Sequence, residues 1–173
     1  MLQAFAGHRP RVDPTAFVHE AAVLIGQVTL GAGSSVWPNA TLRGDDAPIV
    51  VGAQSSIQDG STIHATEGQS RTTVGDRVTV GHNVILHGCT IGDDCLIGMG
   101  SIVLDSAIVE PGAFVGAGTV IPPRKVVRAG TLVMGNPFKL VRVCTQADRD
   151  WIEHSWRAYV RRGQEYLAQA PSR

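Results

Sequence analysis

The stretch Val74-Gly75-Asp76-Arg77-Val78-Thr79-Val80-Gly81-His82-Asn83-Val84-Ile85-Leu86 carries an aliphatic side chain at every sixth position. The same spacing continues over most of the chain, at Leu24, Leu30, Val36, Leu42, Val51, Ile57, Ile63, Ile91, Ile97, Val103, Ile108, Phe114, Val120, Val126, Leu132 and Phe138. A period of six matches neither the 3.6 residues of an α-helix nor the two residues of a half-buried strand. It indicates a chain that coils, with three hexads in each triangular turn. We therefore predict an all-β solenoid, a parallel β-helix of hexapeptide repeats.

Composition supports one small domain with an aliphatic core. The chain has 173 residues, of which 43% are hydrophobic and 5% aromatic, so rows of aliphatic side chains have to form the core, as in other solenoids. Fifteen basic and fifteen acidic residues cancel, and without a basic patch no nucleic-acid partner is expected. No apolar stretch approaches the ~18 residues of a membrane span. Three cysteines without CxxC spacing favour a reducing compartment, so we expect a cytoplasmic protein with no membrane partner.

Interruptions of the hexads divide the chain. Two short steps of five residues, from Leu86 to Ile91 and from Val103 to Ile108, and two longer segments, residues 43–48 and 64–71, interrupt the spacing. Insertions of the longer kind form loops, often on the binding face of a repeat protein. The hexads end near Phe138, so the β-helix is expected over residues 1–140. Thr145-Gln146-Ala147-Asp148 then resembles a capping box. Apolar residues follow on one helical stripe, at Ile152, Trp156, Tyr159, Val160 and Leu167. This predicts a capping helix over residues 145–169 in the same single domain.

Three of the six histidines stand in positions that the repeat relates to one another. His64 and His87 both follow the first residue of a hexad, one turn apart, so they share a corner on coils about 4.8 Å apart. His82 lies on another face, and six extended residues span roughly 20 Å, so a neighbouring subunit would have to supply it. A threefold axis would create equivalent sites at each interface, and three imidazoles leave the open position of a catalytic zinc site. Three chains packed in this way would form a homotrimer, with His64, His82 and His87 as the candidate metal ligands.

Two charged residues repeat this relation one coil earlier. Arg43 falls in the column of His64 and His87, and Asp59 falls in the column of His82. An ion pair between Arg43 of one subunit and Asp59 of the next would therefore lie one step below the metal.

Five short segments resemble the gamma-class carbonic anhydrase family of trimeric left-handed β-helix proteins. They are Leu42-Arg43-Gly44-Asp45, Ile57-Gln58-Asp59-Gly60, Ile63-His64, Gly81-His82 and Leu86-His87-Gly88-Cys89. The resemblance covers about Val12 to Leu140 and the helix that follows. It implies left-handed coils, His64 and His87 as ligands from one subunit and His82 from the next, and Arg43–Asp59 as the interface salt bridge. Asp45 would support that network, and Gln58 would hydrogen-bond the oxygen on the metal.

The resemblance also implies a reaction and a cofactor. The reaction would be reversible hydration of CO2 to bicarbonate, with Zn²⁺, or alternatively Fe²⁺ or Co²⁺, because neutral imidazole suits all three ions. A bound metal lowers the pKa of water to about 7, as zinc does in carbonic anhydrases. Efficient members of the family carry a long acidic loop with a glutamate proton shuttle after the first histidine. Here the loop is short and Glu67 stands nearest that position, which implies Glu67 as proton carrier and a weak activity.

Other functions are compatible with the same coils. A hexapeptide acyltransferase would use a single histidine as base, with an acyl-CoA donor. A thioesterase would use the same metal on a CoA thioester, and a trimeric scaffold would keep the metal without catalysis. Tyr159, on the expected C-terminal helix, is a candidate for the wall of the pocket in the enzymatic cases.

Overall fold

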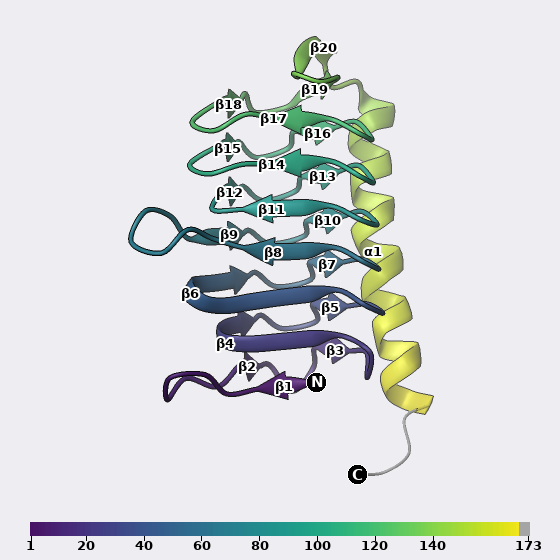
Figure 1. The fold of residues 1–173 in the computed structure, drawn as a ribbon. Helices are drawn as coiled ribbons and strands as arrows, with labels where there is room; N and C mark the ends of the chain where they lie inside the picture. Colours follow the sequence, from purple (N-terminus) through teal and green to yellow (C-terminus); the bar gives the residue numbers. More distant parts are fainter. Residues whose placement is uncertain (170–173) are drawn as a thin grey trace.

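The computed structural model describes residues 1–169 as a three-sided parallel β-helix with one α-helix lying along it. In Figure 1 the front strands run from right to left while the chain climbs from the N-terminus, which makes the coils left-handed. The predicted fold class is therefore confirmed, including its C-terminal helix. No helix within residues 1–169 is long and apolar enough to cross a membrane.

Each side of the prism is a stack of short strands, and consecutive strands of the chain belong to successive faces. The first face holds β1 (Leu2–Gln3), the first parts of β4 (Val23–Leu30) and β6 (Thr41–Val51), β8 (Thr62–His64), β11 (Ile85–His87), β14 (Ile102–Val103) and β17 (Val120–Ile121). The second face holds β2 (Arg11–Val12), the later parts of β4 and β6, β9 (Thr72–Val74), β12 (Thr90–Ile91), β15 (Ile108–Val109) and β18 (Val126–Val127). The third face holds β3 (Phe17–Val18), β5 (Ser35–Val36), β7 (Ser56–Ile57), β10 (Thr79–Val80), β13 (Leu96–Ile97), β16 (Phe114–Val115), β19 (Thr131–Met134) and the antiparallel β20 (Lys139–Val143).

The hexad residues stack into three buried columns, one behind each face. Ile63 pairs with Leu86 on the first face, and Ile57 pairs with Val80 on the third. All four side chains are fully buried. Because the strands of each face pair in register, residues on these strands are aligned with residues one turn above them. This alignment fixes the position of each functional side chain relative to its neighbours.

The last coils depart from the predicted spacing by one residue. Ile91 pairs with Val109, and Val109 pairs with Val127, so the step after Val103 is six residues long and not five. Val109 is fully buried, whereas Ile108 is 42% exposed. The prediction that Ile108, Phe114, Val120, Val126 and Leu132 begin the hexads was wrong. Two adjacent aliphatic residues occur at most of these positions, so hydropathy alone cannot tell which of the two points inward.

A pair of neighbouring substitutions tests this register. We expect Val109→Ala to lower the free energy of unfolding by about 2 kcal/mol, because it deletes two buried carbon groups at ~0.8 kcal/mol each and leaves a cavity. Ile108→Ala removes surface atoms, and we expect a change below about 0.5 kcal/mol. Urea unfolding of the two variants gives the comparison. A larger loss for Ile108→Ala would contradict the observed register.

Helix α1 (Gln146–Gln169) runs back along the third face and contacts β3, β5, β7 and β10. Its start is a capping box: the Thr145 amide donates to Asp148 Oδ2 at 2.7 Å, and the Asp148 amide donates to Thr145 Oγ1 at 3.3 Å. The helix buries Ile152, Trp156 and Gly163 against the sheet. The later half of the helix packs on the sheet through an aromatic cluster, whose neighbouring ring centroids are 5.1–5.4 Å apart. The cluster consists of Phe17, Trp37, Tyr159 and Tyr166.

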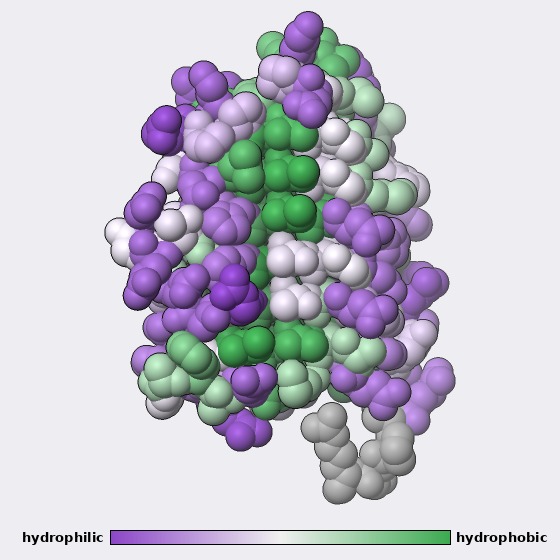
Figure 2. All heavy atoms as spheres, in the orientation of Figure 1, coloured by the Kyte–Doolittle hydropathy of each residue, from purple (hydrophilic) through white to green (hydrophobic). Residues whose placement is uncertain are grey.

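The first face carries an apolar stripe on its outer surface. Ile85 is 40% exposed there, and Ile102 and Val120 of the neighbouring coils are partly exposed. Figure 2 shows this stripe in green over the upper coils, with hydrophilic side chains to its left and paler side chains below it, where the row continues. The two edges of this stripe hold the histidines.

Candidate metal centre

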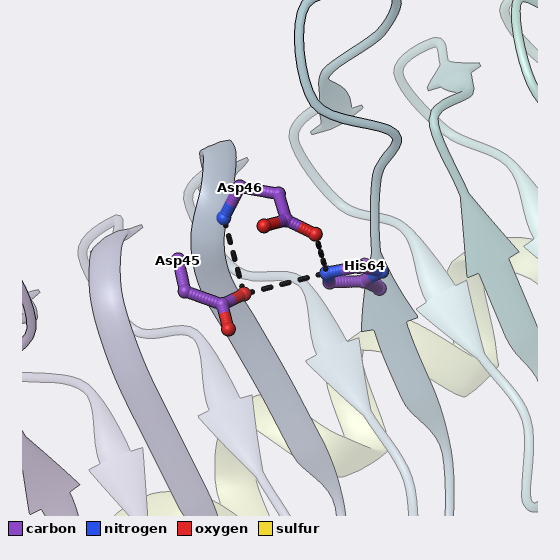
Figure 3. A group of neighbouring side chains, drawn as sticks. All are labelled: Asp45, Asp46 and His64. Atoms are coloured by element: carbon purple, nitrogen blue, oxygen red, sulfur yellow. Dashed lines mark hydrogen bonds and ion pairs between the residues drawn. The ribbon is translucent and has the colours of Figure 1, made fainter.

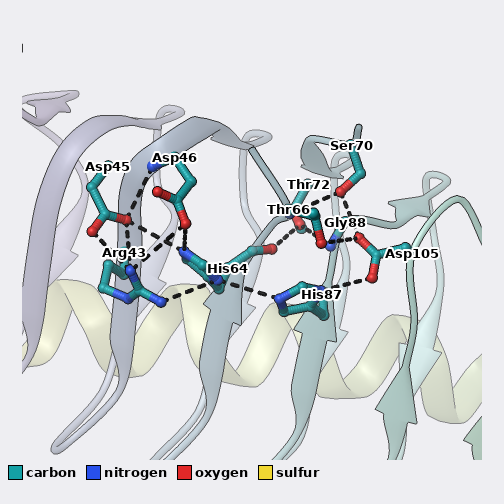
Figure 4. A network of polar contacts seen from close by, with 10 residues as sticks. All are labelled: Arg43, Asp45, Asp46, His64, Thr66, Ser70, Thr72, His87, Gly88 and Asp105. Atoms are coloured by element: carbon teal, nitrogen blue, oxygen red, sulfur yellow. Dashed lines mark hydrogen bonds and ion pairs between the residues drawn. The ribbon is translucent and has the colours of Figure 1, made fainter. Parts of the chain in front are cut away.

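His64 and His87 meet at the edge between the first and second faces. Each ends its strand, β8 or β11, and the two strands pair with His64 directly opposite His87. Their ring centroids are 5.3 Å apart, and His64 Nδ1 lies 3.3 Å from His87 Nε2 (Figure 4). Two nitrogens bound to one tetrahedral zinc ion at 2.0–2.1 Å are themselves about 3.3–3.4 Å apart. The observed separation matches that spacing.

The partners of the two rings define which nitrogens carry protons. Arg43 places NH2 3.2 Å from His64 Nδ1, and a guanidinium has no acceptor atom, so His64 Nδ1 presents a lone pair. His87 Nδ1 lies 3.0 Å from Asp105 Oδ2, and an ionised carboxylate only accepts, so His87 carries its proton on Nδ1. In the neutral rings, two lone pairs therefore face each other. A cation between the two nitrogens, either a proton or a metal ion, would be stabilised by these lone pairs.

The other nitrogen of His64 faces two carboxylates. Nε2 lies 3.3 Å from Asp45 Oδ1 and 3.0 Å from Asp46 Oδ2 (Figure 3), although neither contact has the direction of a hydrogen bond. These three residues could also hold a cation among themselves. We favour the position between the histidines, because a neutral His64 that accepts at Nδ1 carries its proton on Nε2 and has no lone pair there for a cation.

Two aspartates remain ionised beside the histidines. Burial raises the pKa of Asp45, but the hydrogen bond and charge of Arg43 outweigh it, and the pKa falls below its usual value. For Asp105, burial also raises the pKa, and hydrogen bonds from Ser70, His87 and Thr66 together lower it further. The pair of His87 and Asp105 resembles the carboxylate–histidine–metal arrangements that orient ligands in metalloproteins. Asp46 and Asp105 were missed by the sequence analysis.

His82 lies at the opposite edge of the first face, where the third face meets it. It precedes β11, whereas His87 ends that strand, so the width of the face separates the two histidines within one chain. His82 Nδ1 is 3.0 Å from Asp59 Oδ2. Val80 pairs with Ile57, which aligns His82 with Asp59 one coil below, as the column count predicts.

A cavity of about 210 Å³ adjoins His82 between the third face and α1. Its lining includes Gln58, His82, Met99, Trp151, Ser155 and Tyr159. Gln58 is 5% exposed. Burial, and then the negative charge of Asp59, raises the pKa of Tyr159, so its hydroxyl stays protonated at neutral pH. Tyr159 thus brings a hydrogen-bond donor from α1 to the His82 edge.

One chain therefore carries two half-sites, one on each edge of the first face. The His64/His87 half-site contains Arg43, Asp45, Asp46, His64, His87 and Asp105. The His82 half-site contains Gln58, Asp59, His82 and Tyr159. Within the chain, Arg43 NH1 pairs with Asp45 Oδ1 and Oδ2 at 3.0 and 2.8 Å, and Asp59 pairs with His82. The predicted Arg43–Asp59 pair joins opposite half-sites and requires a second chain.

The candidate proton carrier, Glu67, is exposed in the loop between β8 and β9.

Two cysteines lie in the core. Cys89 and Cys95 are buried free thiols, and burial raises the pKa of each to about 12. These thiols stay protonated at neutral pH, so they supply neither a nucleophile nor a thiolate ligand.

Several known proteins share these coils. Residues 88–123 match the family described as bacterial transferase hexapeptide (six repeats). Protein YrdA from Escherichia coli strain K12 is 41% identical over 98% of this chain and 95% of its own. A carbonic anhydrase from Geobacillus kaustophilus is 40% identical over 97% of this chain and 92% of its own. A hexapeptide transferase family protein from Anaplasma phagocytophilum superimposes with a TM-score of 0.92 at 38% identity, over 95% of this chain and 97% of that one.

Fold, half-sites and relatives together define a hexapeptide-repeat β-helix protein. Within that class, the chain belongs to the gamma-class carbonic anhydrase-like family.

Proposed function

We propose that this protein is a metal-dependent carbonic anhydrase that interconverts CO2 and bicarbonate in a homotrimer. His64 and His87 of one subunit and His82 of the next hold the metal at each interface. The observation that carries this proposal is the pair of histidine nitrogens facing each other 3.3 Å apart. The 40% identity to the Geobacillus kaustophilus carbonic anhydrase supports the choice of reaction.

The surface of the first face supports the assembly. Ile85, Ile102 and Val120 form an exposed apolar stripe over the upper coils of this face (Figure 2), and burial against another chain would remove such a stripe from water. In a closed ring of three chains, each His82 edge meets a His64/His87 edge, so every interface is equivalent. His64 would hold the metal through Nδ1, the nitrogen that Arg43 NH2 approaches in the single chain. Arg43 is then available to pair with Asp59 of the neighbouring subunit.

The chemistry is divided between the metal and the chain. A bound Zn²⁺, Fe²⁺ or Co²⁺ would supply Lewis acidity that makes hydroxide available from water near neutral pH for attack on CO2. Gln58 and Tyr159 border the cavity beside His82, where they can hydrogen-bond and orient the reacting oxygen. Glu67, an exposed carboxylate on the loop after His64, accepts the proton that each turnover releases to solvent. Because this short loop carries one such carboxylate, we expect proton removal to be slow.

A second candidate is acyl transfer or thioester hydrolysis with acyl-CoA, because the matched family model and the Anaplasma phagocytophilum structure are described as transferases. A hexapeptide acyltransferase needs a histidine base and no metal, so it leaves the facing pair of His64 and His87 without a role. We therefore favour the carbonic anhydrase. The thioesterase alternative uses the same metal and differs in its substrate.

One sample tests these alternatives together. Protein purified anaerobically without added metal is expected to contain about one divalent ion per subunit and to hydrate CO2 in a stopped-flow assay. The same sample is then given acetyl-CoA, and free CoA is measured with and without an amine acceptor. Bound metal with CoA release and no hydration would replace the carbonic anhydrase by a thioesterase. Amine-dependent CoA release without metal would establish an acyltransferase.

A further inference from the structure

Asp105 connects the His64/His87 half-site to the loop that carries Glu67. It follows β14, one coil beyond His87, and its Oδ2 lies 3.0 Å from His87 Nδ1. Its Oδ1 accepts hydrogen bonds from Ser70 Oγ at 2.6 Å and from Thr66 Oγ1 at 3.1 Å. Thr66 and Ser70 lie on either side of Glu67 in the loop, and the Thr66 amide also donates to Ser70 Oγ at 3.0 Å. One carboxylate thus holds a ligand ring with one oxygen and the loop with the other (Figure 4).

Gly88 provides the space that this carboxylate occupies. A Cβ atom at position 88 would lie 2.2 Å from Asp105 Oδ1 and 2.2 Å from Ser70 Oγ. Gly88 also has a φ of +62°, which disfavours any larger residue there. The Gly88 amide donates to Thr72 Oγ1 at 2.9 Å, and Thr72 Oγ1 donates to the His64 carbonyl. Both histidine strand ends are therefore fixed by the same group of contacts.

We propose that Asp105 is a positioning residue that holds the proton of His87 on Nδ1 and so directs the lone pair of Nε2 toward His64. This inference rests on the proposed metal site and adds a residue to it. The Asp105 carboxylate has no proton to donate, so it accepts the hydrogen of Nδ1 and fixes both the tautomer and the orientation of the ring. Outer partners of this kind typically change metal affinity by 10–100-fold when they are replaced.

Asp105→Asn separates the shape of this side chain from its role as an acceptor. The amide oxygen continues to accept from Ser70 and Thr66, which places the NH2 group against His87 Nδ1. Because NH2 donates, the proton of His87 moves to Nε2, the atom that faces His64. We expect the affinity for Zn²⁺, measured by competition with a chromophoric chelator, to fall about 10–100-fold. In the metal-free variant, the ¹⁵N chemical shifts of His87 are expected to show the proton on Nε2, whereas the metal-free native protein shows it on Nδ1.

Ser70→Ala is the matched control, because it removes one hydrogen bond to Asp105 Oδ1 and leaves the contact with His87. We expect its Zn²⁺ affinity to stay within about threefold of the native value, since the ligand ring keeps its partner. Circular dichroism and the native oligomeric size confirm that both variants fold. Native Zn²⁺ affinity and an unchanged His87 tautomer in Asp105→Asn would overturn the proposal. So would a native protein whose metal-free His87 carries its proton on Nε2.

The tautomer measurement keeps this inference separate from the proposed function. If the native protein binds Zn²⁺ but does not hydrate CO2, the carbonic anhydrase assignment fails while the affinity loss in Asp105→Asn still supports positioning. If the native protein binds no metal, the ¹⁵N shifts still decide whether Asp105 sets the tautomer of His87.

Discussion

Replacing His87 with alanine is expected to abolish metal binding and CO2 hydration together. The change removes one of the two nitrogens that face each other, and in the proposed site it leaves His64 with a single ligand partner, His82 of the neighbouring subunit. Loss of an outer partner costs about 10–100-fold in affinity, so loss of a direct ligand should exceed about 100-fold. Metal analysis of the purified variant and a stopped-flow hydration assay on the same sample measure both effects.

The control for this substitution is His8→Ala. His8 is exposed in the N-terminal turn and belongs to neither half-site, and its loss should leave metal content and hydration unchanged. The fold should survive His87→Ala, because Leu86, which anchors that coil in the core, is untouched and fully buried. CO2 hydration that persists in a metal-free His87→Ala protein would contradict the proposed chemistry.

The hexad count predicted much of this site because the β-helix repeats one register. Once Ile63 and Leu86 are assigned to the same core column, His64 and His87 must be adjacent, and the structure has that pairing. The same count aligns Asp59 with His82, and Asp59 Oδ2 lies 3.0 Å from His82 Nδ1. These are backbone alignments, and a fixed period determines them without knowledge of side-chain conformation.

Features outside this regular register were not predictable in the same way. Asp105 and Asp46 reach the histidines from a turn and a bent strand, where hexad positions no longer state the direction of a side chain. The shift at Val109 was missed because its neighbour Ile108 is equally apolar, and burial of one in place of the other depends on packing with Ile91. A column count also cannot reveal that Arg43 pairs with Asp45 within its own chain.

The metal content of trimers that contain two different variants distinguishes most clearly between a site shared by two subunits and a site within one chain. In the proposed trimer, His64→Ala chains alone and His82→Ala chains alone would each lack a ligand at every interface. When both chains are in one trimer, one interface brings an intact His64/His87 half-site against an intact His82 half-site. That interface is restored although neither parent chain is functional.

The most direct test of the shared metal site is therefore the metal content of trimers that contain both variants. The two chains are co-expressed with different non-histidine tags, and mixed trimers are isolated by successive purification on each tag. We predict about one divalent ion per mixed trimer, where the native trimer holds about three, with CO2 hydration recovered in proportion. His64→Ala mixed with His87→Ala is the control and should recover nothing, since both changes damage the same half-site. Mixed His64→Ala and His82→Ala trimers without metal, or equal recovery in the control, would contradict a site shared between subunits.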